Sequence, residues 1–260
     1  MNSIQCRALP DIPAIEPGDD LADLLCRSAQ RAGLEFRAGD VLVVAQKIIS
    51  KAEGRTAALS GVEPSRRARE IADATGRDPR LVEVILRESN EVVLAARAAL
   101  VVEHRTGVVC ANAGVDRSNV SGDEAGEDVV CLLPEDSDAS ARRLRDQIRE
   151  RTGTEVAVIV SDTHGRPFRR GVAGVAIGAA GIEPLFDHRG ERDLFGRPLE
   201  MTVVARADEA AAAASLLMGQ AGEGRPAVLI RGLEFEKSDA GARALFRPKD
   251  EDLFRGGGNR

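Results

Sequence analysis

Polar and charged side chains that could support catalysis are concentrated in residues 161–171. These eleven residues provide a carboxylate (Asp162), two hydroxyls, an imidazole (His164), three guanidinium groups and two glycines. They follow the apolar run 156–160, so we expect a loop that leaves the end of a buried strand. The carboxylate and hydroxyls suit a hard cation, and the guanidinium groups suit phosphate or carboxylate. A solvated turn capped by Asp162 is the simpler alternative.

A second oxygen-rich segment, residues 110–119, follows a predicted strand at 108–110. Its polar side chains are Asn112, Asp116, Ser118 and Asn119. Asn and Asp are also the usual residues of Asx-type turns, which would explain them without any ligand. However, Mg²⁺ or Mn²⁺ is commonly held by one or two carboxylates together with phosphate oxygens and water. We therefore favour a cation shared by Asp116 and Asp162.

Two of the four lysines in the chain lie in a third such segment, residues 46–55. Arginine supplies the other positive charges, apart from Lys237 and Lys249. Lysine is a compact point charge, whereas arginine is a planar fork. In a chain that otherwise uses arginine, lysines at 47 and 51 suggest a site that needs a point charge, such as a contact with phosphate or a nucleotide. A charged strand tip after the apolar run 41–44 is an equal alternative.

Two glycine-rich segments lie in the second half of the chain. In residues 171–181, four glycines with Val and Ile disfavour a helix by about 1 kcal/mol per glycine, so we expect an extended segment that another backbone or a ligand approaches closely. In residues 219–226, three glycines within six residues suit a backbone that wraps a ligand. A helix stop would explain one of those three.

Hydrophobic periodicity and turn residues predict the elements that position these segments, in an α+β fold with mixed or antiparallel sheets and flanking helices. The predicted helices span residues 19–32, 64–76, 78–90, 137–152 and 208–218, the last capped by Asp208. The predicted strands span residues 41–44, 92–94, 100–102, 108–110, 156–160, 201–205 and 227–230. The Pro-rich residues 1–18 should form an edge or a covering loop, and residues 120–136 a surface loop.

Several charged residues receive a simpler interpretation. Glu88 and Glu91 are expected to be exposed acids at a helix end, although they could reach a site. Arg142, Arg143 and Arg145 are expected to form a solvated helix face.

Composition excludes several classes of protein. The 260 residues carry a net charge of -6, with neither Trp nor Tyr, which argues against a nucleic-acid-binding surface. No apolar run approaches the roughly 20 residues of a membrane span, and no signal-peptide pattern begins the chain. We therefore expect a cytoplasmic protein. The four cysteines lack the spacing of a zinc site, and we expect isolated thiols.

Four motifs, in this order along the chain, resemble those of the coenzyme F420-0:L-glutamate ligase family, also called F420:γ-glutamyl ligases. They cover nearly the whole chain to about residue 235, and they are Val43–Arg55, Asn112–Asn119, Ser161–Gly171 and Leu217–Ala227. The resemblance implies one ligase domain at residues 1–235, built from two interleaved lobes, and a polar tail at 236–260. It also implies an intertwined homodimer of two-lobed subunits.

The family resemblance further implies a GTP-dependent amide ligase that uses two divalent ions, Mg²⁺ or Mn²⁺, with K⁺ as a further candidate. By this resemblance the metals are held by Asp116, Asp162 and Thr163, with Gln220 where the family can carry an acid. GTP would contact Ile12, Pro13, Ala14, Ile15, Gln46, Lys47, Lys51 and Asn119. It would also contact Met218, Gly219, Gln220, Ala221, Gly222, Glu223, Gly224 and Arg225.

The reaction class fits these side chains. Phosphoryl transfer from GTP to the carboxylate of coenzyme F420-0 gives an acyl phosphate, and the amine of L-glutamate displaces phosphate. Lys51 and one of Arg166, Arg169 or Arg170 would offset the developing charge. His164 is a candidate proton acceptor, with a structural loop histidine as the alternative. A metal-dependent phosphatase and a non-catalytic nucleotide-sensing module are the competing functions.

Overall fold

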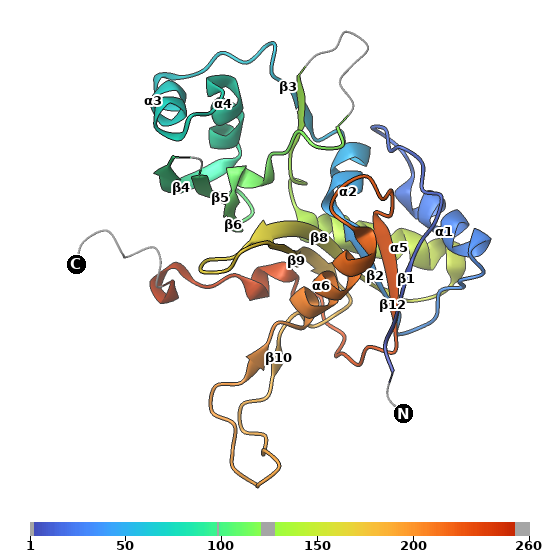
Figure 1. Cartoon of the computed structure of the whole chain (residues 1–260). Helices are drawn as coiled ribbons and strands as arrows, with labels where there is room; N and C mark the ends of the chain where they lie inside the picture. Colours follow the sequence, from blue (N-terminus) through green and yellow to red (C-terminus); the bar gives the residue numbers. More distant parts are fainter. Residues whose placement is uncertain (1–2, 98, 121–127, 253–260) are drawn as a thin grey trace.

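The structure, a computed structural model, describes residues 3–97, 99–120 and 128–252, and it contains several sheets with flanking helices (Figure 1). The largest sheet has five strands in the order β1-β12-β2-β8-β9. Their bounds are β1 Gln5–Ala8, β12 Ala227–Arg231, β2 Val41–Ala45, β8 Ala157–Gly165 and β9 Val172–Ala180. Only β2 and β8 run parallel, and every other neighbouring pair is antiparallel. The expected combination of mixed or antiparallel sheets with flanking helices is confirmed.

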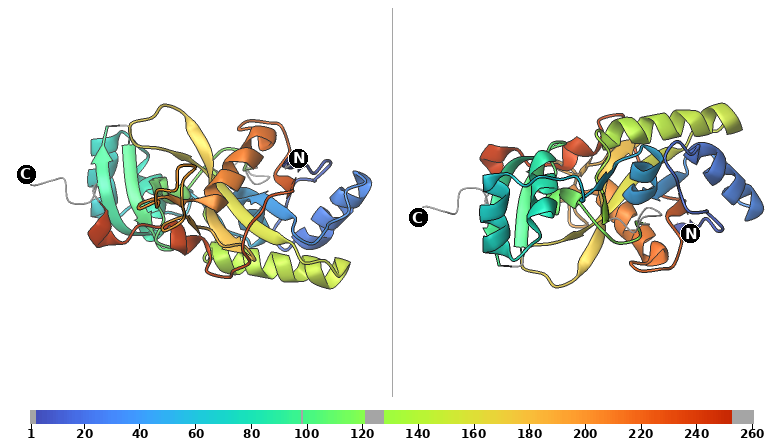
Figure 2. Two further views of the ribbon diagram at one scale, coloured as in Figure 1. Left: turned by 90° about the horizontal axis from the view of Figure 1, so that it is seen from below. Right: turned by 90° about the horizontal axis from the view of Figure 1, so that it is seen from above.

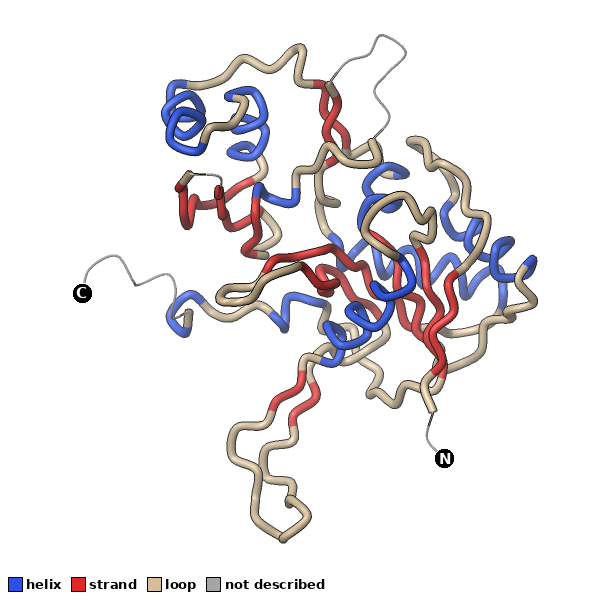
Figure 3. Tube along the Cα trace, in the orientation of Figure 1, coloured by secondary structure: helices blue, strands red, loops and turns tan. Residues whose placement is uncertain are grey.

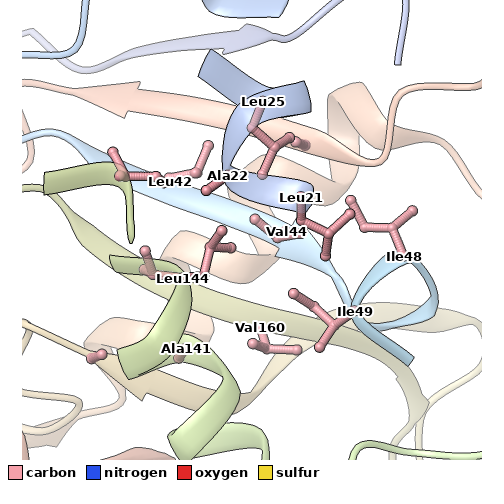
Figure 4. Close-up of a cluster of buried hydrophobic side chains, with 14 of the residues drawn as sticks. Leu21, Ala22, Leu25, Leu42, Val44, Ile48, Ile49, Ala141, Leu144 and Val160 are labelled. Atoms are coloured by element: carbon pink, nitrogen blue, oxygen red, sulfur yellow. The ribbon is translucent and has the colours of Figure 1, made fainter. Parts of the chain in front are cut away.

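Helices cover both faces of this sheet because its central strands are apolar on both sides. Leu42 and Val44 face a core formed with α1 (Leu21–Arg31), α2 (Gln46–Ala52) and α5 (Ser137–Thr152), shown in Figure 4. Val41 and Val43 face a second core formed with α6 (Arg206–Met218). Figure 2 shows α5 and α6 on opposite sides of the sheet. The continuous apolar run of β2 is therefore the pattern of a strand buried on both faces.

A second lobe is inserted between α2 and α5. Its elements are β3 Thr56–Ala58, α3 Arg66–Thr75, α4 Pro79–Arg87, β4 Ser89–Ala96, β5 Ala99–His104, β6 Val109–Ala111, the 3₁₀ turn η1 Asn112–Gly114, and β7 Val129–Cys131. β4, β5 and β6 form an antiparallel sheet, and β3 pairs with β7. A separate hydrophobic cluster contains residues from 57 to 132 only.

The glycines of β9 explain how closely the helices approach the sheet. A Cβ atom on Gly174 would lie 2.7 Å from the carbonyl oxygen of Ala211 in α6. A Cβ atom on Gly178 would overlap the backbone of Ser137, the first residue of α5. The glycine-rich segment is thus an extended strand approached by other backbones, as predicted.

A long arm, residues 183–205, projects from the main body (Figure 3). The short strands β10 (Phe186–Asp187) and β11 (Val203–Val204) pair at its base. Leu194 and Phe195 are 99% and 88% exposed at its far end. The strand predicted at 201–205 is shorter in the structure, where β11 contains only Val203 and Val204.

The prediction of a loop directly after residue 160 was wrong, and so was the helix cap assigned to Asp208. Residues 161–165 continue β8 in a hairpin with β9, so the turn lies at 166–171 rather than immediately after residue 160. Residues 46–52 form helix α2, so the alternative of a charged strand tip does not apply. Asp208 lies in the first turn of α6 and accepts a hydrogen bond from the Ala176 amide of β9, so it does not cap the helix.

Three predictions about surfaces were also wrong. Glu88 is 6% exposed and pairs with Arg55, which lies far from it in the sequence. Arg145 packs inward and pairs with Asp239. The segment expected to be a surface loop at 120–136 contains β7 and the buried Leu132 and Leu133; residues 121–127 of that segment lie outside the described part.

The polar tail begins with packed structure. The 3₁₀ turn η2 (Ala242–Leu245) places the buried Ala242 against the core beneath α6. A further turn, η3 (Lys249–Glu251), places Lys249 beside Glu91 and Glu103 of the second lobe. The end of the tail, 253–260, lies outside the described residues. None of the described helices has the length and apolar character needed to cross a membrane.

Candidate functional site

A cleft of about 550 Å³ opens where the parallel strands β2 and β8 end. Ligands commonly bind at the carboxyl ends of parallel strands, where the following segments can supply polar groups. The cleft is lined by Ile12, Pro13, Ala14, Ala45, Gln46, Lys47, Ile48, Lys51, Asp116, Ser118, Asn119, Ser161, Asp162, Thr163, Ser215, Met218, Gly219, Gln220, Ala221, Gly222, Glu223, Gly224, Arg225 and Pro226. In Figure 1 the orange loop after α6 arches toward α2.

The two lysines enter the cleft from α2. This helix begins directly after β2, so Lys47 and Lys51 lie one turn apart and project from the same helix face. Lys47 Nζ lies 2.6 Å from Asp116 Oδ2 and donates to the Ser118 carbonyl at 3.0 Å. Lys51 Nζ donates to the Asn119 carbonyl at 2.7 Å. The lysines therefore hold the 116–119 segment against the cleft while keeping their charges beside it.

Asp116 is held in its charged form. Its carboxylate accepts hydrogen bonds from the Ser118 amide at 2.8 Å and the Ser118 hydroxyl at 2.7 Å. Burial alone would raise the pKa of Asp116, but the Lys47 ammonium and the Ser118 donors outweigh it and lower the pKa. The backbone of Asp116 also pairs with that of Cys131, which fixes the segment to the second lobe.

Asp162 and Thr163 enter from the extension of β8 beyond the sheet core. The β8–β9 ladder changes register between Val160 and Ser161, a bulge that re-aims the following side chains. His164 Nε2 lies 3.0 Å from Asp162 Oδ2. Burial, with the nearby Asp162 charge, raises the pKa of Cys110 to about 12. Cys110 belongs to β6, so Asp162 lies where the second lobe meets the sheet.

The oxygen donors of the cleft fit a divalent cation. Carboxylates of Asp116 and Asp162, the Thr163 residue and the Gln220 amide line the same space. Across the described ranges, no three His, Cys, Asp or Glu residues cluster as a metal-binding group. This donor set is too poor in charged ligands for a closed protein site, but it suits Mg²⁺ or Mn²⁺, which take most ligands from phosphate and water.

The glycine-rich loop after α6 forms the remaining wall. Gly219 ends the helix with φ 73° and ψ -173°, a conformation available essentially to glycine alone. Asn119 Nδ2 donates to the Ala221 carbonyl at 3.2 Å, which joins this loop to the lysine-bound segment. The three predicted polar segments thus converge in one cleft.

Some predicted site residues lie outside the cleft. Ile15 is packed in the hydrophobic core below it. His164 reaches the cleft only through Asp162, and Arg166 and Arg169 lie at the hairpin turn. Conversely, the sequence reasoning did not assign Ser215 or Pro226, which line the cleft. Ser215 lies in an Ala-rich helix that carries no sign of ligand chemistry.

The chain resembles known proteins over nearly all its length. A family model described as F420-0:Gamma-glutamyl ligase matches residues 11–232. The "Coenzyme F420:L-glutamate ligase" of Methanothermobacter thermautotrophicus is 49% identical over 247 residues, covering 94% of this chain and 96% of the relative. The protein with the same description in Methanopyrus kandleri is 51% identical over 245 residues, covering 93% of each chain. That of Archaeoglobus fulgidus is 46% identical over 244 residues, covering 94% of this chain and 93% of the relative.

Proposed function

Because this chain belongs to the F420-0:γ-glutamyl ligase family, we propose that it joins L-glutamate to coenzyme F420-0 at the cleft, as a ligase of coenzyme F420 biosynthesis. The observation that supports this assignment most directly is the convergence of two lysines, two aspartates and a glycine-rich loop on one space. Such a set binds a polyphosphate together with divalent cations. Further γ-linked additions of glutamate would use the same groups.

The nucleotide is proposed to be GTP. Its triphosphate would lie between Lys47, Lys51 and the 218–225 loop, and its base would lie toward the apolar wall at 12–14. Lysine ammonium groups neutralise phosphate as point charges, and the glycine-rich backbone lets amides approach closely.

Asp116 and Asp162 would hold two divalent ions, with Thr163 and Gln220 supplying further oxygens. Bound there, the ions would neutralise phosphate oxygens. The two carboxylates lie on different elements, so their spacing is set by the junction between the sheet and the second lobe.

The chemistry proceeds in two steps. A carboxylate oxygen of F420-0 attacks the γ-phosphorus of GTP, the bond to the β-phosphate oxygen breaks, and GDP leaves. The L-glutamate ammonium loses one proton to solvent, and its nitrogen attacks the acyl carbon. Phosphate departs with the electron pair of the broken C–O bond and takes the second proton that the nitrogen releases. Positioning and charge neutralisation supply most of the catalysis in such transfers.

Residues of this chain contribute in different ways. Lys51 would stabilise charge on the transferred phosphoryl group. Arg166 and Arg169, at the hairpin turn beyond Asp162, would attract the anionic F420-0 toward the end of β8. His164 contacts Asp162 directly, so we propose that it orients this carboxylate instead of accepting the ammonium proton.

Mass spectrometry of the products tests the function. Incubation of F420-0 with L-glutamate, GTP and Mn²⁺ or Mg²⁺ should add one glutamyl residue to F420-0 and release GDP and phosphate. Asp116→Asn and Asp162→Asn should abolish this mass gain and weaken Mn²⁺ binding measured by electron paramagnetic resonance, with an unchanged circular dichroism spectrum. GDP release without L-glutamate would support a phosphatase, and GTP binding with no turnover would support a nucleotide sensor.

We further propose a homodimer. The arm at 183–205 exposes Leu194, Phe195 and Met201, which is unfavourable for an isolated chain in water. Light scattering should give twice the chain mass, and replacing Leu194 and Phe195 by Ser should return the mass of one chain.

A further inference from the structure

Two glutamates lie directly opposite each other on neighbouring strands of the second lobe. Glu91 of β4 and Glu103 of β5, which we call the acidic pair, are register partners in the antiparallel sheet. Like charges at opposed positions destabilise a sheet, and Glu103 is also buried, so the acidic pair favours a cation between its carboxylates. Lys249 provides that cation, because its Nζ lies 3.0 Å from Glu91 Oε2 and 2.9 Å from Glu103 Oε2.

The tail that carries Lys249 is anchored to the main sheet by buried contacts. The Asp138 carboxylate, at the start of α5, accepts hydrogen bonds from the Ala179 amide of β9 at 2.8 Å and from the Ala242 amide of the tail at 2.7 Å. Ala242 is fully buried, and a Cβ atom on Gly241 would overlap the Asp138 carboxylate. Breaking this anchor would leave a buried carboxylate with fewer donors, which is unfavourable.

Residues 237–249, which we call the C-terminal strap, therefore connect the sheet to the second lobe. Both views of Figure 2 show the red tail beside that lobe. Between the two ends, Phe246 packs against the core of the sheet, and a Cβ atom on Gly107 of the β5–β6 turn would lie 3.6 Å from its ring. The side chain of Lys249 is 60% exposed, so the outer end of the strap can open while the buried anchor stays closed.

A movement of the second lobe would reach the cleft because the lobe has one hydrophobic core. Val102, next to Glu103 on β5, packs in the same cluster as Val115. Val115 directly precedes Asp116, which lines the cleft. Packed cores move as units and do not deform continuously. Displacement of the lobe at the acidic pair would therefore move Asp116 relative to Asp162 of β8.

We propose that the C-terminal strap is a latch: Lys249, held between the carboxylates of the acidic pair, keeps the second lobe against the sheet and thereby positions Asp116 in the cleft. Lys249 itself does not line the cleft, so it is a positioning residue. When the contact opens, the lobe turns about its two chain connections, residues 53–55 and 132–136, and the cleft widens. The latch does not depend on the reaction, whereas its effect on GTP rests on the proposed function.

Alkylation of Cys110 measures the opening of the lobe without any ligand. This thiol belongs to β6 of the second lobe but is buried against the core of the sheet. Lys249→Gln removes the ammonium group, so we expect Cys110 to react with iodoacetamide about two- to fivefold faster, as for loss of a partly exposed ion pair. Peptide mapping separates Cys110 from Cys6 and Cys26, whose rates should not change because they lie on β1 and α1.

Matched variants show whether the charge of Lys249 is responsible. Lys249→Arg keeps the charge and should react like the unchanged protein. Lys237→Gln removes the other lysine of the strap, which pairs with Glu155, and should leave the Cys110 rate unchanged. Lys249→Glu should accelerate alkylation further, and adding Glu91→Lys to it should restore a slow rate because opposite charges again face each other.

Urea separates opening of the lobe from unfolding of the whole chain. Opening of one lobe exposes little surface, so the alkylation rate of Cys110 should depend weakly on urea well below the unfolding midpoint. A steep dependence in every variant would mean that Cys110 is reached only by global unfolding, and it would overturn the latch. Equal Cys110 rates for Lys249→Gln and the unchanged protein would also overturn it.

The effect on the cleft is measured by the release of a fluorescent GTP analogue in the presence of Mn²⁺. Lys249→Gln should raise the dissociation rate about two- to fivefold, with Lys249→Arg restoring it. Faster alkylation of Cys110 with unchanged release would overturn the positioning of Asp116, because the lobe would then open without acting on the cleft. Failure of the proposed function looks different: the analogue would bind neither the unchanged protein nor any variant, and the Cys110 rates would still decide whether the latch exists.

Discussion

Lys47 Nζ lies 2.6 Å from Asp116 Oδ2, although the two residues belong to different lobes of the structure. The pair therefore joins a group suited to phosphate with a group suited to a cation. Each partner neutralises the other, and each is only partly exposed. A nucleotide bound with its divalent cation would satisfy both charges at once, which favours binding of the two together.

The first prediction concerns this lysine. Lys47→Gln removes a charge-assisted phosphate contact and leaves Asp116 without its cation, so the affinity for GTP should fall about tenfold or more. The free energy of unfolding should change by less than about 1 kcal/mol, because the ion pair is partly solvated. Calorimetric titration and urea denaturation measure the two effects.

Lys237→Gln is the matched control, since Lys237 forms a surface ion pair with Glu155 and neither residue lines the cleft. This variant should bind GTP like the unchanged protein. Equal GTP affinities for the two lysine variants would remove Lys47 from the nucleotide site.

The second prediction concerns the close approach of α5 to the sheet. Gly178→Ala places a methyl group against the Ser137 backbone, which cannot move as a side chain could. Overpacking of this kind costs about 1–3 kcal/mol, so the urea midpoint should fall clearly. Gly61→Ala is the control, because a Cβ atom there meets open space and the backbone φ is not positive. Equal midpoints for the two variants would contradict the packing.

Parts of the fold could be predicted because their signals are local. The helix predicted at 78–90 begins where the sequence indicates, because Asp78 caps α4 and Pro79 occupies its first turn. The unbroken apolar run at 41–44 likewise predicts a buried strand, and β2 is buried on both faces. In contrast, α2 begins at Gln46, and the preceding N-cap residue Ala45 has no side chain that could cap the helix, so the sequence carries no start signal there.

Other features depend on contacts distant in sequence. Residues 161–165 are polar because β8 extends past the hydrophobic core, and a polar strand there resembles a loop. Glu88 looked like an exposed acid, since the sequence near it contains no sign of Arg55 as a partner. The three polar cleft segments were recognisable from residue types, whereas the pairing of Lys47 with Asp116 arises only when the second lobe docks.

The third prediction concerns pH. The hydrogen-bonded Arg80 guanidinium lowers the pKa of Asp78 from 3.8 to about 2, so this carboxylate is charged in the folded protein at pH values where it protonates in the unfolded chain. Its stabilisation is present above pH 3.8 and is lost as the pH falls toward about 2. Asp78→Asn keeps a capping side chain but removes the charge.

We therefore expect Asp78→Asn to lower the free energy of unfolding by about 1 kcal/mol at pH 7, a value reduced for partial solvation of the pair. The difference from the unchanged protein should shrink steadily as the pH is lowered from 4 to 2. Urea denaturation at several pH values measures it. A difference independent of pH over this range would show that the charge of Asp78 contributes nothing.

The last prediction concerns the connection between the lobes. Arg55 lies between α2 and β3, donates from Nε to the Leu133 carbonyl at 3.0 Å, and pairs with the buried Glu88 of the second lobe. Burial would raise the pKa of Glu88, but the neighbouring His104 ring, 3.6 Å away, and the guanidinium groups of Arg55 and Arg105 lower it overall. Glu88 is therefore charged, and it requires partners because an unpaired buried charge is costly.

Arg55→Met should lower the free energy of unfolding by about 2 kcal/mol, less than the usual loss for a broken buried pair because Arg105 remains 3.2 Å from Glu88. Adding Glu88→Gln removes the uncompensated charge, so the double variant should be more stable than Arg55→Met alone. Urea denaturation of both single variants and the double variant gives the coupling energy. The losses in free energy of unfolding of the two single variants would simply add if Arg55 and Glu88 did not interact. Arg55 would then support the junction only through its hydrogen bond to Leu133 and its packing, and the charge of Glu88 would be satisfied within the second lobe.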